Sequence, residues 1–110
     1  MSLPVSIASR AEADLAHQYR WYLDNASSEV AERFLKAFCD TSSKLAQQPG
    51  IGWARKFRAP ELAGIRSFPI VGRFGVHLIF YRVSGHALSI ERVMHGARDL
   101  PHRLLDPPEN

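Results

Sequence analysis

The sequence predicts an α+β fold, in which an antiparallel pair of helices packs on a small, largely antiparallel β-sheet. Two amphipathic stretches follow each other between about residues 10 and 48, which predicts the helices. An apolar run over residues 75–83 and an alternating run over residues 87–93 predict strands. With a strand before the first helix and another before residue 75, the predicted order is β-α-α-β-β-β, followed by a short C-terminal tail or helix.

The first predicted elements are a short strand and a helix. Residues 5–8 alternate apolar and small side chains, as is typical of a strand. Ser9 and Glu12 have the spacing of a capping box, which predicts that a helix begins at about residue 10. One face of this helix is expected to carry Leu15, Tyr19 and Tyr22. Trp21 lies on a different face, so we expect it to be partly exposed.

The second helix has the clearest periodicity in the chain. Its core-facing positions are expected to be Val30, Phe34, Phe38, Thr41 and Leu45. Ser27 or Ser28 can cap its start, and Pro49-Gly50 should end it. The connection between the helices is only about four residues long, which predicts an antiparallel hairpin.

The glycine- and proline-rich residues 49–64 predict a loop, which Trp53 and Phe57 are expected to anchor onto the core. The strand predicted after it, over residues 65–70, contains Pro69 and should end there or lie at a sheet edge.

The last two strands are predicted to form a hairpin. Residues 75–83 are apolar at nearly every position, which is typical of a strand that is central or covered on both faces. Residues 87–93 alternate, with Leu88, Ile90 and Arg92 expected on one side. Ser84-Gly85 between the two runs favours a tight turn.

The length and composition favour one compact domain. The chain has 110 residues, of which 45% are hydrophobic and 23% charged, so we expect a single domain over residues 1–110 with an ordered core of about residues 4–105. No apolar run approaches the roughly 20 residues of a membrane span, and the N-terminus lacks signal-peptide features, which predicts a cytoplasmic protein. The single cysteine, Cys39, excludes an internal disulfide and is interpreted as a small buried packing residue.

The charge is unevenly distributed. Residues 1–50 carry five basic and six acidic side chains, whereas residues 51–110 carry nine basic and five acidic ones. Eight of those nine are arginine, the side chain best suited to bidentate contact with phosphate or carboxylate. The second half is therefore expected to meet an anionic partner, although a solvated basic surface would have the same composition.

Residues 92–100 are the most informative stretch for function. The last strand is predicted to end at His95, Gly96 releases the backbone, and Arg98 follows within reach of the same sheet end. Basic side chains of neighbouring segments could converge there, namely Arg66, Arg73 and Arg82. Such a cluster would suit phosphate oxygens or an acidic protein. The alternative is that Arg98 pairs with a nearby acid and His95 merely closes the strand.

Familiar enzyme signatures are missing from the sequence. It contains no Walker or Rossmann glycine loop, no His-Glu-x-x-His, no Cys-x-x-Cys and no Gly-x-Ser-x-Gly. A metal site would have to combine His86, His95 and His102 from a turn, a strand end and a tail, which is unfavourable. We therefore expect no metal and no other cofactor.

Six segments in this order resemble the ParE branch of the ParE/RelE toxins, the toxic halves of type II toxin–antitoxin, or plasmid stabilisation, modules. The segments are Ala-Asp-Leu at 13–15, Ala-Glu-Arg-Phe-Leu at 31–35, Leu-Ala-Gln-Gln-Pro-Gly-Ile-Gly at 45–52, Ile-Arg-Ser-Phe-Pro at 65–69, Leu-Ile-Phe-Tyr-Arg-Val at 78–83 and Val-Met-His-Gly-Ala-Arg-Asp at 93–99. The resemblance runs from about residue 5 to 105.

The resemblance implies the fold predicted above and a cognate antitoxin whose flexible arm lies over the toxin as an extended segment and a helix. For ParE-like members the implied target is DNA gyrase, and for RelE-like members it is messenger RNA on the ribosome. Arg98 matches the Gly-x-Arg position shared by both branches, and Arg66 lies on the strand where the nucleases keep basic residues. However, no lysine follows Lys56, no tyrosine follows Arg98, and Tyr81 is expected to be packed in the central strand.

The leading hypothesis is therefore a growth-inhibiting, ParE-like toxin that binds gyrase and catalyses no reaction with its own residues. Its target-binding residues are predicted to be Arg66, Arg73, Arg82, His95, Arg98 and Arg103. In the alternative, a RelE-like endoribonuclease, phosphate stabilisation and proton transfer would fall to Arg66, Arg73, His95 and Arg98. A third possibility is a non-toxic relative that only binds an antitoxin.

Overall fold

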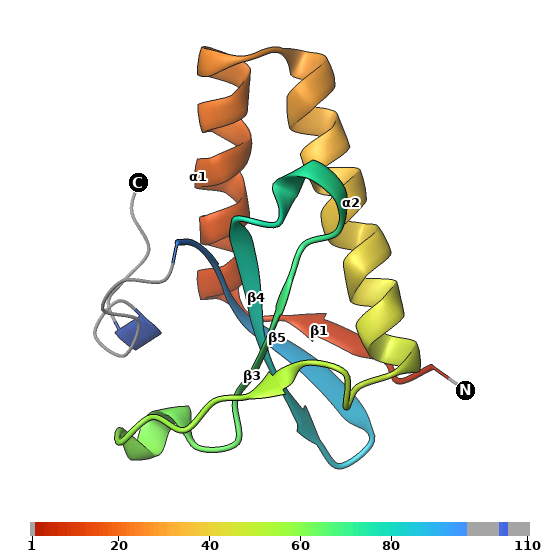
Figure 1. The fold of residues 1–110 in the computed structure, drawn as a ribbon, viewed down its shortest axis with the longest axis vertical. Helices are drawn as coiled ribbons and strands as arrows, with labels where there is room; N and C mark the ends of the chain where they lie inside the picture. Colours follow the sequence, from red (N-terminus) through yellow and green to blue (C-terminus); the bar gives the residue numbers. More distant parts are fainter. Residues whose placement is uncertain (1, 97–103, 106–110) are drawn as a thin grey trace.

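The computed structural model describes residues 2–96 and 104–105, and it confirms the α+β prediction (Figure 1). The elements, in chain order, are β1 (Val5–Ile7), α1 (Ser9–Asn25), α2 (Ser28–Gln47), β2 (Trp53–Ala54), the 3-10 helix η1 (Pro60–Leu62), β3 (Arg66–Pro69), the 3-10 helix η2 (Gly72–Phe74), β4 (His77–Ser84) and β5 (Ala87–His95). None of the helices among the described residues is long and apolar enough to cross a membrane.

The five strands form one sheet in the order β1-β5-β4-β3-β2. All neighbours are antiparallel except β1 and β5, which run parallel with Val5 opposite Leu88 and Ile7 opposite Ile90. β3 ends at Pro69, as predicted. β2 lies inside the segment predicted to be a loop, because a two-residue strand is defined by its tertiary pairing with β3 and leaves no periodic signal in the sequence.

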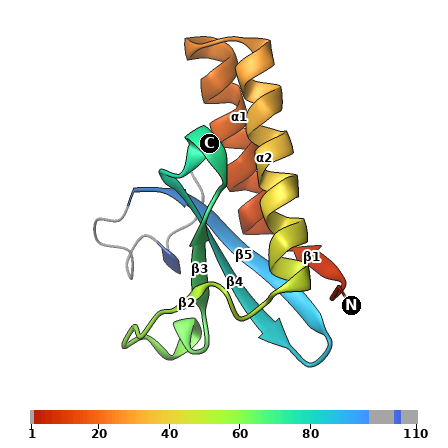
Figure 2. The same ribbon diagram turned by 45° about the vertical axis from the view of Figure 1, so that its right-hand side comes forward.

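The two helices pack side by side on one face of the sheet (Figures 1 and 2). The face of α2 predicted to be apolar is buried at Phe34, Phe38, Thr41 and Leu45. Phe34, Phe38 and Leu45 join Ile79, Tyr81 and Ile90 of β4 and β5 in the main core. The periodicity of α2 therefore identified the helix and the side that faces the sheet.

A second, smaller core lies on the opposite face of the sheet. It joins Leu62, Ile65, Phe80, Met94 and Leu104, with Phe57 packed against it. Phe57 is thus the anchor that was predicted, but Trp53 is not, because its side chain is 66% exposed. β2 is the outermost strand of the sheet, so no neighbouring strand flanks Trp53 on its outer side.

The predicted capping box is wrong. α1 begins at Ser9 with Ala8 as N-cap and no side-chain cap, and the Glu12 amide donates to the carbonyl of Ala8 at 3.0 Å. The Ala8 amide itself donates to the carbonyl of Ile90 at 2.8 Å, so pairing with β5 fixes where the helix starts. For α2 the prediction holds, because the Ser27 hydroxyl accepts a hydrogen bond from the Val30 amide.

The interpretation of Cys39 as buried is also wrong, since it is exposed. Successive residues on a helix are rotated by about 100°, and burial of Phe38 turns the next side chain away from the core.

Candidate functional site

The cationic cluster predicted from the sequence does not assemble as expected among the described residues. His95 pairs with His77 at one end of the β4–β5 hairpin, whereas Arg82 pairs with Ser89 toward the other end. Arg66 pairs with Tyr81, also away from His95, and Arg73 is exposed in η2. The antiparallel register therefore separates residues that were expected to converge. Arg98 and Arg103 lie outside the described residues.

Arg66 holds the chain that leads into β2. Its Nη1 donates to the carbonyl of Gly52 at 2.8 Å and to that of Gly50 at 3.4 Å. Beside it, the hydroxyl of fully buried Tyr81 donates to the carbonyl of Pro49 at 2.8 Å and accepts from the Gly52 amide at 2.9 Å. A Cβ on Gly52 would lie 2.3 Å from the Tyr81 hydroxyl, so this close approach requires glycine. Burial raises the pKa of Tyr81, while the Gly52 amide and Arg66 oppose that rise.

Arg82 holds a different loop. It follows Tyr81 in β4, so its side chain leaves the sheet on the opposite face. Its guanidinium donates to the carbonyl of Ala63 at 2.9 Å and to the carbonyl of Glu61, while its buried Nε has no hydrogen-bond partner. Arg66 and Arg82, both predicted to bind the target, thus each position a loop beside the sheet.

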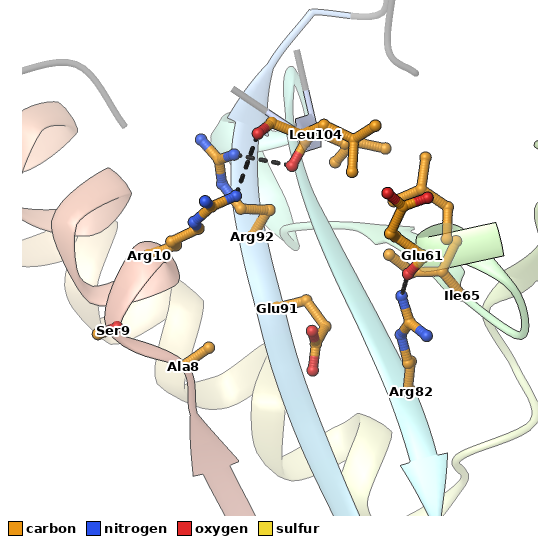
Figure 3. Close-up of a pocket in the computed structure, with 11 residues that line it drawn as sticks. Ala8, Ser9, Arg10, Glu61, Ile65, Arg82, Glu91, Arg92 and Leu104 are labelled. Atoms are coloured by element: carbon orange, nitrogen blue, oxygen red, sulfur yellow. Dashed lines mark hydrogen bonds between the residues drawn. The ribbon is translucent and has the colours of Figure 1, made fainter. Parts of the chain in front are cut away.

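A groove of about 580 Å³ opens between η1, the start of α1 and β5 (Figure 3). Its lining residues are Ala8, Ser9, Arg10, Glu61, Leu62, Ile65, Arg82, Glu91, Arg92, Leu104 and Leu105. The guanidiniums of Arg10, Arg82 and Arg92 donate hydrogen bonds to backbone carbonyls of this region, and these bonds hold the walls of the groove in place. Glu61 and Glu91 add two carboxylates, which gives the groove mixed charge around an apolar floor.

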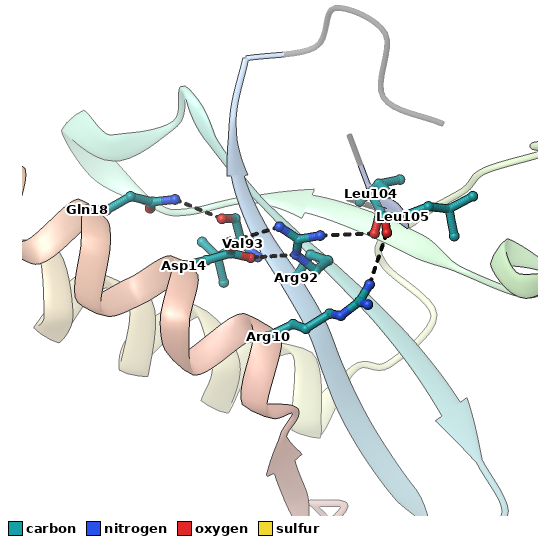
Figure 4. Close-up of polar contacts among 7 residues, drawn as sticks. All are labelled: Arg10, Asp14, Gln18, Arg92, Val93, Leu104 and Leu105. Atoms are coloured by element: carbon teal, nitrogen blue, oxygen red, sulfur yellow. Dashed lines mark hydrogen bonds and ion pairs between the residues drawn. The ribbon is translucent and has the colours of Figure 1, made fainter. Parts of the chain in front are cut away.

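Arg92 and Asp14 form a buried ion pair at the back of this groove (Figure 4). Arg92 Nε donates to Asp14 Oδ2 at 2.8 Å, and Arg92 Nη2 donates to Asp14 Oδ1 at 3.0 Å. Both side chains are at least nine-tenths buried, so the bidentate geometry satisfies charges that water does not reach.

The same carboxylate protects the edge of β5. β1 pairs with β5 only as far as Ile90, so the backbone of Val93 has no strand on that side. Asp14 Oδ2 accepts from the Val93 amide at 3.0 Å, and Gln18 Nε2 donates to the Val93 carbonyl at 2.7 Å. Side chains of α1 therefore replace a missing strand.

The ion pair also fixes the chain that follows the sheet. Arg92 Nη1 donates to the carbonyl of Leu104 at 3.0 Å, and Arg10 Nη1 donates to that of Leu105 at 3.2 Å (Figure 4). We call Arg10, Asp14, Gln18, Arg92 and Val93, with the two carbonyls, the α1–β5 junction. The sequence did not reveal it. Arg92 was expected on the same side of β5 as Leu88 and Ile90, and this is wrong: the register shifts between Phe80 and Tyr81, so Arg92 pairs with Phe80 and lies on the face of the smaller core, whereas Leu88 and Ile90 lie in the main core.

His95 belongs to an aromatic cluster at the far end of β4 and β5. Its ring lies 5.2 Å from that of His77, centroid to centroid, and His77 Nε2 is 2.8 Å from the Tyr22 hydroxyl. Burial, and secondarily the nearby His95, lowers the pKa of His77 to about 4. His77 is therefore neutral near pH 7.

Comparisons with known proteins agree on one family. A family model described as "ParE toxin of type II toxin-antitoxin system, parDE" matches residues 5–100, a span that contains every helix and strand described here. A solved structure described as "Chromosomal ParDE TA system from P. aeruginosa" is similar with a TM-score of 0.70 and 22% identity, covering 87% of this chain and 98% of that one. At that identity the likeness concerns the fold. No curated protein matches the chain.

Proposed function

Because this chain belongs to the ParE family of toxins of type II toxin–antitoxin systems, we propose that it inhibits DNA gyrase by binding and is held inactive by a cognate antitoxin. The family match over residues 5–100 is the observation that carries this proposal. The proposed place of action is the cytoplasm, where gyrase and the antitoxin would meet the toxin.

The groove is the proposed seat of the antitoxin arm. An extended segment fits a concave surface that offers an apolar floor at Leu62 and Ile65 together with both signs of charge. The carboxylates of Glu61 and Glu91 would receive basic side chains of the arm, and filling the groove would cover part of the α1–β5 junction.

The proposed target-binding residues fall into two groups. Arg73 and His95 are exposed and remain proposed contact residues, together with Arg98 and Arg103. Arg66 and Arg82 hold backbone carbonyls, so their substitution is expected to act through the loops that they position. The two groups can therefore be separated by comparing activity with stability in each variant.

The direct test incubates the purified protein with gyrase and supercoiled plasmid. We expect reduced supercoiling and trapped cleavage complexes, both reversed by the antitoxin encoded beside the gene. Arg98→Ala should lose this effect while keeping the melting temperature and antitoxin binding, and Arg33→Ala on the outer face of α2 is the matched control. Unchanged supercoiling at a large molar excess would exclude gyrase as the target.

Induction of the gene in cells tests the other activities. New 5′ ends in translated message that vanish in Arg98→Ala would replace the proposal with ribosome-dependent cleavage. Undiminished growth without the antitoxin would identify a non-toxic relative.

A further inference from the structure

The net positive charge of this chain is concentrated at one edge of its sheet. Residues 53–66, which we call the edge lobe, carry four basic side chains and one acidic one, a net of +3. The whole chain has the same net charge, because the other 96 residues carry ten basic and ten acidic side chains. The edge lobe contains β2, η1 and the first residue of β3, and it projects from the sheet on the side away from the helices (Figure 2).

The charge of the edge lobe is not neutralised by acidic side chains. Ion pairs within residues 2–96 and 104–105 join Arg33 to Glu29, Lys36 to Asp40 and Arg92 to Asp14, and none of them reaches the edge lobe. Lys56 and Arg58 are exposed, and Arg66 donates to neutral carbonyls, which leaves its charge uncompensated. The edge lobe therefore presents a positive potential to solution.

The edge lobe also contains an exposed aromatic side chain. Trp53 is 66% exposed, more than any other large hydrophobic side chain among the described residues. The amide of Arg55 donates a hydrogen bond to the carbonyl of Ile65, which continues the pairing of β2 with β3 by one residue. Because side chains alternate along a strand, those of Trp53 and Arg55 lie on the same face of the sheet. The guanidinium of Arg55 lies 5.8 Å from the centre of the Phe80 ring, so this cation is fixed by the smaller core.

We propose that the edge lobe binds single-stranded nucleic acid, with a base stacked on Trp53 and the adjoining phosphates held by Lys56 and Arg58. Stacking on an aromatic side chain beside a basic surface is how proteins bind single strands without sequence preference. An acidic protein segment would use the charge but not the exposed indole, and a duplex would keep its base faces hidden. The inference goes beyond the proposed function, whose target is a protein.

The binding test uses the full chain and a labelled oligothymidylate of about 12 nucleotides, which spans one or two single-strand sites. Anisotropy should show binding that weakens as salt increases, because phosphate contacts release counterions. In the Trp21→Phe background Trp53 is the only tryptophan, and its emission should be quenched on saturation. Polyglutamate and a duplex of the same length should compete weakly.

Two variants separate stacking from charge. Trp53→Ala should weaken binding about tenfold or more without changing the salt dependence, since one stacked base is lost. Lys56→Gln with Arg58→Gln should reduce the slope of log affinity against log salt by about 1.4, or roughly 0.7 for each phosphate contact. Arg33→Gln with Lys36→Gln removes the same charge from α2 and should leave the affinity unchanged.

Three results would overturn the proposal: no quenching of Trp53, equal affinity for polyglutamate or duplex, or an equal loss in the α2 control. Circular dichroism of each variant distinguishes lost binding from lost folding. The gyrase assay on the same variants distinguishes the two proposals. A variant that loses oligonucleotide binding but still inhibits gyrase would show that the edge lobe is separate from the gyrase-binding surface.

Discussion

The α1–β5 junction and the edge lobe both contain basic side chains, but these are buried and paired at the junction and exposed in the edge lobe. At the junction, Arg92 is buried, bidentate with Asp14 and bonded to the carbonyl of Leu104. In the edge lobe, Lys56 and Arg58 are exposed and face no acid within 4.0 Å among the described residues. Charge at the junction therefore serves the fold, whereas charge in the edge lobe is available to another molecule. Counting arginines in the sequence cannot separate these two cases.

The strongest test of this contrast is Asp14→Ala. It would remove the carboxylate that neutralises buried Arg92 and that accepts from the Val93 amide, so we expect a loss of about 3–5 kcal/mol in the free energy of unfolding. Urea denaturation measures this loss. Glu12→Ala, on an exposed site of the same helix, should cost less than about 1 kcal/mol. A loss of similar size in both variants would mean that the junction is not a stabilising feature.

The second prediction concerns pH and the buried His77. Its pKa is about 4 in the folded chain and near 6.5 in the unfolded chain, so the unfolded state binds more protons between these values. Stability should be fully present above pH 6.5 and should fall as the pH is lowered toward 4, by about 3 kcal/mol at most.

Urea denaturation across this pH range measures the effect, and His77→Gln should flatten the profile. His86→Gln, on an exposed turn, should keep the wild-type slope. If His77→Gln retains the full acid dependence, other groups are responsible for it.

Tyr81→Phe tests the connection between the core and the edge lobe. The change would leave the Pro49 carbonyl and the Gly52 amide without their partner, and we expect a loss of about 1–3 kcal/mol. Limited proteolysis should then cut residues 49–58 faster than in the wild type, with Tyr19→Phe on α1 as the control. Unchanged proteolysis would show that the Tyr81 hydroxyl is not needed to hold this segment.

The smallest effect on stability is expected from the edge lobe itself. Lys56→Gln with Arg58→Gln removes exposed charges that make no ion pair within the described residues, so the free energy of unfolding should change by less than about 0.5 kcal/mol. Thermal denaturation checks this. A clear destabilisation would mean that Lys56 and Arg58 stabilise the fold, as Arg92 does at the junction, and that the two regions do not differ in this respect.

The helices and most strands could be predicted because their signals are local. The apolar spacing of Phe34, Phe38 and Leu45 is a property of one helix, and burial of that face follows from any packing partner. The parallel pairing of β1 with β5, and the two-residue strand β2, depend on contacts between distant segments. Periodicity within a segment carries no information about them.

The candidate site was less predictable for the same reason. The expected meeting of Arg82 with His95 assumed a sheet end that the β4–β5 register does not provide. The partners of Arg92 and Trp53 depend on which element covers them: α1 reaches Arg92, and nothing among the described residues covers most of Trp53. Exposure is decided by tertiary packing, and residue type alone does not reveal it.

The pairing of the first strand with the last also governs when this protein takes shape during its synthesis. Val5 is synthesised before its partner Leu88, which follows 83 residues later in the chain. In the same way, β4 cannot pair with β5, and Asp14 cannot bind Arg92, until the later residues have been synthesised. A chain that stops before residue 87 lacks the strand that joins both sides of the sheet, so a prematurely terminated product would be an unfolded fragment, ready for proteolysis.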